Sequence, residues 1–187
     1  MIIILILILI LILLFIFCAR NKKIENYENE KKYKLAIMAI FKNEEDYMEE
    51  WLDHHIKQGF NHFYLYCNDP LIKKYYFLLS SKYNRYITLI PWVNKKNNGK
   101  KTIQRQAYNH CVKTFCSEYK FIMMLDIDEF IVNKEKDKRV IDFLDLINSN
   151  NNEIKAIKIP RFDFCSDGHI RKPEGNVDDN YKRRENL

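Results

Sequence analysis

The chain begins with an unbroken apolar run that differs from the mixed pattern after it. Residues 2–17 carry no polar side chain, and with Met1, Cys18 and Ala19 the run would extend about 28 Å as a helix at roughly 1.5 Å per residue. This length suits a thin bilayer and predicts a transmembrane helix over residues 1–19 that acts as an uncleaved signal-anchor. A cleaved signal peptide is the alternative, but the run lacks a positive n-region and a small-x-small cleavage pattern.

A charged, Asn-rich segment separates this run from the rest of the chain. Residues 20–33 show little apolar periodicity, which predicts a short stem before a globular domain at 34–187. Arg20, Lys22 and Lys23 follow the apolar run, and no basic residue precedes it. By the positive-inside rule, these charges would hold the domain on the cytosolic side of a membrane.

Beyond the stem, short apolar runs alternate with longer amphipathic stretches. The runs are bounded by polar residues or turn formers, as expected for strands that are buried on both faces. They predict strands at 34–41, 62–67, 85–92, 120–125 and 154–160, with a further short β-rich piece at 130–132.

The stretches between the runs favour helices. They predict helices at 44–57, 71–83, 102–116 and 140–148. Gly59 supplies a stop beyond the first, Pro70 can open the second, and Thr102 can cap the third. Alternating strands and helices predict an α/β fold with a mostly parallel sheet, helices on both faces and ligands at the carboxyl ends of the strands.

Composition limits the size and the character of the domain. With 187 residues, of which 47% are hydrophobic, the chain can bury one sizeable core. The net charge of +6 arises from 31 basic and 25 acidic residues, so bulk charge does not argue for a nucleic-acid partner. A basic membrane-surface or RNA-binding protein is one function class to consider, but the sequence carries no recognisable RNA-binding signature.

One segment has an uneven charge. Between Asp69 and Glu118 there is no acidic residue and there are ten basic ones. Such a surface could attract a diphosphate or an acidic membrane face, and the alternative is a lysine-rich solvated face. Lys100, Lys101 and Arg105 are the candidates for ligand binding, because their loop and helical turn could approach the ligand edge of the sheet.

Cysteine usage leaves two interpretations open. Cys18 belongs to the apolar run, and the other four are Cys67, Cys111, Cys116 and Cys165. In an oxidising compartment four cysteines allow three pairings, and otherwise they are free thiols. Their spacing does not resemble a zinc site.

The feature with the clearest chemistry is the pair Asp126 and Asp128. It follows five consecutive apolar residues, and two carboxylates with one residue between them point to the same side of an extended chain. Such oxygen ligands suit Mn²⁺ or Mg²⁺ shared with a substrate diphosphate. A phosphatase of the haloacid-dehalogenase type also begins Asp-x-Asp, but it requires Thr or Val where this chain has Phe130 and more chain downstream.

Further motifs occur with this pair in a fixed order. They read IFKNEE at 40–45, EWLDHH at 50–55 followed by Gly59, HFYLY at 62–66, QAYNHC at 106–111 and LDIDEF at 125–130. Together they resemble the glycosyltransferase family 92 domain and its relatives in the glycosyltransferase 2 superfamily, over roughly residues 34–175. The resemblance implies a GT-A (Rossmann-like) fold, a UDP-sugar donor such as UDP-galactose, a Mn²⁺-type cofactor and inversion at the anomeric carbon.

The resemblance also implies roles for single residues. Donor-binding roles fall on Lys42, Asn43, Glu44, Asn68, Asp69, Gln106, Asn109 and Asp126. The segment 161–169 resembles a family segment that reads Phe-Gly-Ser-x-Gly-His, with Cys165 in place of the Gly. Candidates for the catalytic base, which the sequence does not rank, are Asp163, Asp167, His169 and Glu174, and His169 is also a candidate metal ligand.

The expected partners are a nucleotide-sugar donor, a glycan, glycoprotein or glycolipid acceptor, and a membrane bound through residues 1–19. The resemblance implies a single-pass Golgi or endoplasmic reticulum protein with a lumenal domain, opposite to the flanking charges. The chain ends earlier than we expect for a family member with a full acceptor side. A non-catalytic remnant that binds nucleotide sugars or glycans is therefore the alternative to an active glycosyltransferase.

Overall fold

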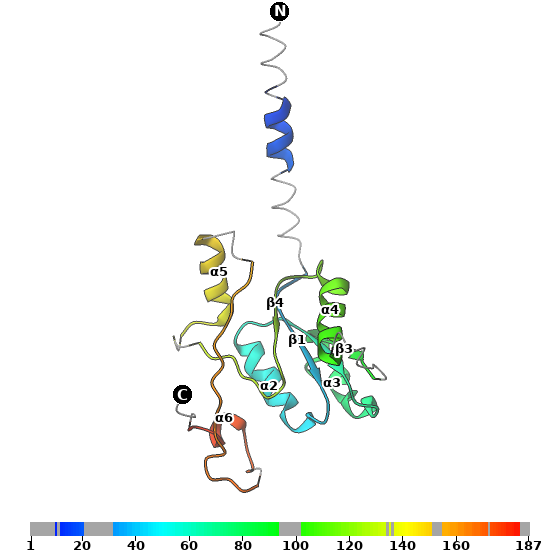
Figure 1. The fold of residues 1–187 in the computed structure, drawn as a ribbon, viewed down its shortest axis with the longest axis vertical. Coiled ribbons are helices and arrows are strands. Elements are labelled where there is room, and N and C mark those ends of the chain that lie inside the picture. Colours follow the sequence, from blue (N-terminus) through cyan, green and yellow to red (C-terminus); the bar gives the residue numbers. More distant parts are fainter. Residues whose placement is uncertain are drawn as a thin grey trace, which may run out of the picture.

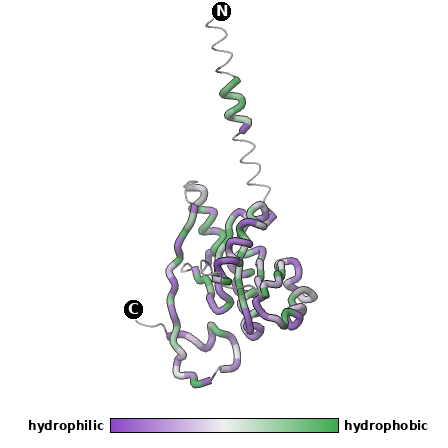
Figure 2. Tube along the Cα trace, turned by 45° about the vertical axis from the view of Figure 1, so that its right-hand side comes forward, coloured by the Kyte–Doolittle hydropathy of each residue, from purple (hydrophilic) through white to green (hydrophobic). Residues whose placement is uncertain are grey.

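The computed structural model describes residues 10, 12–20, 32–93, 102–133, 135, 137–150, 155–171 and 173–183. Residues 12–20 are helical, and Figure 2 shows this helix as largely hydrophobic. Within the described ranges, no helix is both long and apolar enough to cross a membrane. Half of the predicted transmembrane segment, residues 1–9 and 11, and most of the predicted stem lie outside these ranges.

The domain is built on a four-stranded sheet (Figure 1). The strands are β1 (Tyr33–Phe41), β2 (His62–Cys67), β3 (Ile87–Pro91) and β4 (Tyr119–Met124), in the order β3-β2-β1-β4. All neighbours are parallel, with Leu35 of β1 opposite Phe121 of β4 and Phe63 of β2 opposite Ile87 of β3. The predicted parallel α/β sheet is confirmed.

Helices cover both faces of this sheet, as predicted. Alternate residues of β1 point to opposite faces, because side chains alternate along a strand. On one face Leu35 and Ile37 join a core with α2 (Glu45–Lys57) and α5 (Val140–Asn150). On the other face Ala36 and Met38 join a second core with α4 (Ile103–Phe115).

The two helices that frame the site begin and end where the sequence places their signals. The first turn of α2 is acidic and its last turn is basic, which suits the helix dipole. Gly59 follows with a φ of +96°, a conformation that favours glycine. The Thr102 side chain accepts a hydrogen bond from the Arg105 amide at 3.2 Å, so the predicted cap of α4 is confirmed.

The predicted helix at 71–83 is wrong. This stretch forms two short pieces, η1 (Ile72–Tyr75) and α3 (Phe77–Ser80), and η2 (Asn84–Tyr86) follows it. The hydroxyls of Ser80 and Ser81 donate to carbonyls three residues earlier, and Ser81 itself is extended. Such local bonds compete with a regular helix and end it early.

The predicted strands after β4 are also absent from the described residues. Residues 130–132 are irregular, and side chains of α2 occupy both backbone groups of Ile131 at their centre. Residues 155–160 form no strand, and Ile157 and Ile159 are exposed. Pro160 lacks the N–H that would continue a ladder.

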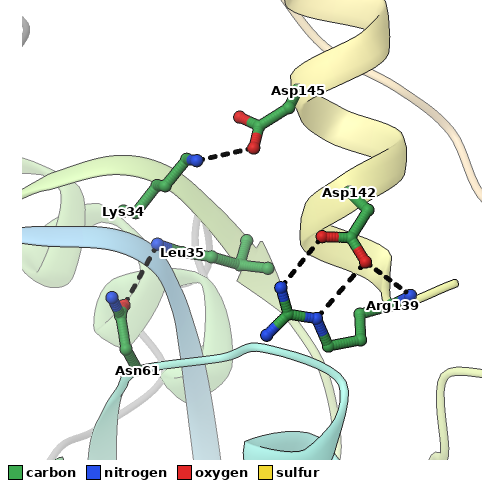
Figure 3. A network of polar contacts seen from close by, with 6 residues as sticks. All are labelled: Lys34, Leu35, Asn61, Arg139, Asp142 and Asp145. Carbon is green, nitrogen blue, oxygen red and sulfur yellow. Dashed lines mark hydrogen bonds and ion pairs between the residues drawn. The ribbon is translucent and has the colours of Figure 1, made fainter.

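Helix α5 is attached to the start of β1 (Figure 3). Lys34 of β1 pairs with Asp145 at 2.6 Å, and Arg139 pairs with Asp142 at the first turn of the helix. The Asn61 side chain accepts the Leu35 amide at 3.1 Å, which ties the turn after α2 to the same strand. Ile141 packs against Gly59, whose missing side chain leaves room for it.

Candidate active site

A pocket of about 530 Å³ opens at the carboxyl ends of β1 and β4, and we call it the edge pocket. Its wall consists of the β1–α2 loop, the end of β2, the first turn of α4 and residues 126–129, which we call the acidic turn. The lining residues are Ile40, Phe41, Lys42, Glu44, Asn68, Thr102, Ile103, Gln104, Asp126, Ile127 and Asp128.

The strand order explains this location. From β1 the chain proceeds to β2 and β3 on one side, and then returns through α4 to β4 on the other side of β1. The order therefore reverses between β1 and β4. In open parallel sheets ligands bind in the crevice outside such a reversal, at the carboxyl ends of the strands.

The acidic turn is closed by its own last residue. The Glu129 amide donates to the Asp126 carbonyl at 3.1 Å, and the Glu129 carboxylate accepts the Asp126 amide at 3.2 Å. Ile127 is buried in the core. Because Ile127 anchors the turn from behind, Asp126 and Asp128 are presented to the edge pocket.

Acidic groups accumulate at this pocket. Burial raises the pKa of Asp126, and the charges of Glu129 and Asp128 raise it further. Burial also raises the pKa of Glu44, with further contributions from Asp128 and Glu45. A cation bound here would relieve this repulsion, because it favours the charged form of each carboxyl group.

The residues offered to a cation are fewer than the sequence predicts. Within the described part of the chain, no three His, Cys, Asp or Glu side chains are grouped so as to hold a metal ion. Asp126 and Asp128 supply carboxylate oxygens, the ligand type that Mn²⁺ and Mg²⁺ prefer. His169 does not line the edge pocket. Asp126 and Asp128 alone could therefore hold such a cation only together with ligands from outside the chain.

The first turn of α4 contributes residues that the sequence analysis missed. Gln104 donates to the Asp126 carboxylate at 3.3 Å and to the Tyr108 hydroxyl at 2.9 Å. Of the predicted residues on this helix, Asn109 donates to the Arg105 carbonyl and none lines the pocket. The cap at Thr102 predicts where α4 begins. It does not predict which face of α4 lies toward the ligand edge, because that depends on how the helix packs on the sheet.

Some polar residues of the loops after β1 and β2 line the edge pocket, and others bind Lys74. Lys42, Glu44 and Asn68 line the edge pocket. Asn43 and Asp69 do not: Lys74 donates to Asn43 at 3.3 Å and pairs with Asp69 at 2.8 Å. The remaining candidates from the acid-free segment, Lys100 and Lys101, lie outside the described residues.

Lys74 joins these two loops, which gives a testable prediction. It also pairs with Glu45 at 3.0 Å, and the Asp69 side chain is only 4% exposed. Replacing Lys74 with Met leaves a buried carboxylate unpaired, and we expect a loss of about 1–2 kcal/mol in the free energy of unfolding by urea.

The matched control is Lys82→Met. Lys82 pairs with Asp53 at 2.9 Å, but both side chains are more than half exposed. A pair of this kind contributes less than about 1 kcal/mol. Equal losses for the two variants would mean that Lys74 does not join the loops.

The predicted catalytic candidates lie in the C-terminal segment, away from the pocket lining. Asp163 pairs with Arg161, and the His169 ring contacts Tyr181. Asp167 pairs with Arg183, whose hydrogen bonds lower the pKa of Asp167 to about 2. The Glu174 carbonyl accepts the Asn180 side chain.

Two contacts tie this segment to the site. Arg161 pairs with Glu129 at 3.5 Å, and Glu50 of α2 accepts the Val177 amide at 2.8 Å, at the start of α6 (Val177–Asn180).

All five cysteines are free thiols in the structure, and Cys67 and Cys111 are buried.

An open parallel α/β sheet with carboxylate, amide and lysine side chains at its reversal point defines the class of α/β domains that bind ligands at this edge. The sequence matches the model of glycosyltransferase family 92 over residues 31–186. The chain belongs to glycosyltransferase family 92.

A curated relative supports this assignment. A glycosyltransferase family 92 protein of Ricinus communis is 26% identical over 112 residues, which cover 58% of this chain and 18% of that protein. The chain thus spans about a fifth of the length of this relative. No solved structure gives a significant match.

Proposed function

We propose that the protein is a glycosyltransferase of the GT-A type that transfers a sugar, such as galactose, from a UDP-sugar to a glycan, glycoprotein or glycolipid acceptor with inversion. The observation that carries the proposal is the position of Asp126 and Asp128 in the edge pocket of a family 92 chain. In such a site, Mn²⁺ or Mg²⁺ held by Asp126 and Asp128 would neutralise the charge of the departing diphosphate.

The pocket residues have chemistry that suits the donor. Lys42 supplies a positive charge for a phosphate, and Asn68 and Thr102 supply polar groups for a ribose or a base. Gln104 holds one oxygen of Asp126 through its amide group. Inversion further needs a base that accepts the proton of the acceptor hydroxyl as that oxygen attacks the anomeric carbon.

The base remains a proposal among four candidates. Asp167 is the weakest, because its lowered pKa makes it a poor proton acceptor. Asp163, His169 and Glu174 share the segment that Arg161 attaches to Glu129 of the acidic turn. The acceptor would then approach from the side of the C-terminal segment.

A non-catalytic protein that binds nucleotide sugars is the second candidate. It is favoured by the absence of all four base candidates from the lining of the edge pocket in the described residues. Release of free sugar from a UDP-sugar in the presence of Mn²⁺ would contradict this second candidate.

Titration calorimetry tests the donor site. We use the full chain in a mild detergent, because of its apolar N-terminus, and titrate UDP with and without Mn²⁺. Asp128→Asn should weaken Mn²⁺-dependent UDP binding at least tenfold, or about 1.4 kcal/mol, by removing one ligand charge. The matched control is Asp179→Asn, an exposed acid on α6, which should bind as the wild type does. Absence of Mn²⁺-dependent heat in the wild type would contradict the proposed function.

The location follows as a proposal from the family and from the apolar N-terminus. Residues 1–19 would anchor the chain in a Golgi or endoplasmic reticulum membrane, with the domain in the lumen. Protease added to sealed vesicles should leave the domain intact and digest it once detergent is added. Digestion in sealed vesicles would place the domain in the cytosol, as the flanking charges indicate.

A further inference from the structure

Three neighbouring side chains of α2 bind the backbone that directly follows the acidic turn. The Trp51 indole donates to the Glu129 carbonyl at 2.9 Å. The His54 ring nitrogen Nε2 lies 2.7 Å from the Ile131 carbonyl, so it must carry the proton and donate it. The Ile131 amide donates to Nε2 of His55 at 3.4 Å. We call Trp51, His54 and His55 the α2 clamp.

One histidine of the clamp donates a hydrogen bond to Ile131, and the other accepts one from it. The Nδ1 atom of His55 lies 2.7 Å from the Trp51 carbonyl and donates to it, which leaves Nε2 as the acceptor for Ile131. His54 donates where His55 accepts, so both backbone groups of Ile131 are satisfied. The ring of Phe130 lies against both imidazoles, at centroid distances of 5.2 and 6.1 Å.

The held backbone determines where the carboxylates lie. Glu129 is fixed by Trp51 at its carbonyl and closes the acidic turn through its own amide and side chain. Only one residue, Asp128, stands between this fixed point and the buried Ile127. A shift of the chain at Glu129 or Ile131 would therefore displace Asp128 and, through the closing bonds, Asp126.

We propose that the α2 clamp positions Asp126 and Asp128 for ligand binding in the edge pocket, so that Trp51, His54 and His55 are positioning residues rather than ligand contacts. This inference rests on the proposed function. No clamp residue lines the pocket. The pattern Trp-x-x-His-His gives these side chains one helical face, because positions three and four apart lie side by side.

His54 allows a discriminating pair of variants. His54→Leu removes the donor while it keeps apolar bulk, whereas His54→Gln keeps an N–H donor at a similar reach. The matched control is Tyr83→Phe, which removes a different hydrogen bond to α2, from the Tyr83 hydroxyl to the Glu49 carbonyl at 3.3 Å. His54→Leu and Tyr83→Phe each remove one hydrogen bond from a side chain to the backbone, so their general effects on stability are matched.

Two readouts on the full chain test the proposal. The first is the affinity for UDP with Mn²⁺, and the second is hydrogen exchange of the backbone amides of residues 126–131. Loss of one hydrogen bond corresponds to roughly fivefold. We expect His54→Leu to weaken binding and to speed exchange about fivefold, whereas His54→Gln and Tyr83→Phe stay within about twofold of the wild type.

Failure of the clamp is distinguishable from failure of the proposed function. If the wild type binds UDP with Mn²⁺ and His54→Leu binds equally well, the clamp does not position the site. If Tyr83→Phe weakens binding as much as His54→Leu does, the effect is general stability and the inference is overturned. If the wild type does not bind, the proposed function fails, and unchanged exchange in His54→Leu then removes the clamp as well.

Discussion

Acidification from pH 7 to pH 5 should lower the free energy of unfolding by about 4 kcal/mol through two buried histidines alone. Burial lowers the pKa of His55 to about 3 and that of His62 to about 4. Both side chains are almost completely buried, so solvent screens them little. The positive charge of Lys32 further lowers the pKa of His62.

The sign follows from the two states. In the unfolded chain both imidazoles have a pKa near 6.5, so they bind protons as the pH falls below this value. In the folded chain they stay neutral until pH 4 and below. The full free energy of unfolding is therefore present above pH 7, where the rings are neutral in both states. It decreases progressively as the pH falls from 6.5 toward the folded pKa values.

Urea unfolding at pH 7, 6 and 5 checks this prediction. The control is His62→Gln, which can keep a contact with the Thr88 hydroxyl, now 2.9 Å from His62, but binds no proton in this range. Its loss between pH 7 and 5 should be about 2 kcal/mol smaller than that of the wild type. The raised pKa values of Glu44 and Asp126 favour the folded state as the pH falls, opposite to the histidines. This effect is the same in the wild type and in His62→Gln, so it cancels when their pH slopes are subtracted. Identical pH slopes would contradict a neutral His62.

Gly59→Ala should destabilise the domain by about 3 kcal/mol, from strain at positive φ and from overpacking of the core. The φ of Gly59 is +96°, and an added Cβ would lie 2.6 Å from a methyl group of Ile141. Ile141 is buried between α5 and the sheet, so it cannot move without displacing α5. The measurement is the free energy of unfolding by urea at pH 7.

Gly168→Ala separates the two causes. Gly168 has a similar φ of +87°, but nothing lies within 4 Å of an added Cβ. Strain without overpacking should cost about 1 kcal/mol. The difference of about 2 kcal/mol between the variants measures the contact between Gly59 and α5. Equal losses would mean that α5 does not pack against the end of α2.

The parts of the fold that the sequence predicts are those in which burial and local signals agree. Strand β2 was predicted with its observed ends, because all six residues from His62 to Cys67 are buried and turn formers follow them. Helix α4 was predicted from the Thr102 cap and the apolar spacing after it. In these elements nothing distant competes with the local preference.

Of two failures, one has a local cause and the other a tertiary cause. The stretch after Pro70 has helical spacing, but Asp69 accepts the Leu71 amide and pairs with Lys74, which fixes a different backbone path. The residues at 130–132 have the composition of a strand, yet both backbone groups of Ile131 bind side chains of the α2 clamp. A sequence pattern does not state which distant side chain will take a backbone group.

The site divides in the same way. Asp126 and Asp128 are singled out by their position after a buried strand, whereas the family resemblance implies Lys42, Glu44 and Asn68, which lie in loops that follow strands; all five line the edge pocket. Asn43 and Asp69 satisfy the same criterion but bind Lys74, since position alone does not separate a ligand contact from an internal partner. Gln104 was missed because its role depends on the rotation of α4 about its axis.

The pairing of β1 with β4 has a consequence for the newly made chain. Leu35 has its partner in Phe121, so one edge of the central strand is incomplete until the ribosome has released β4. Translation at about 5–20 residues per second makes this interval of the order of ten seconds. Throughout it the backbone of β1 offers open hydrogen-bonding groups beside apolar side chains, a combination that promotes aggregation. Cellular yield should therefore depend on chaperones that cover this edge during synthesis.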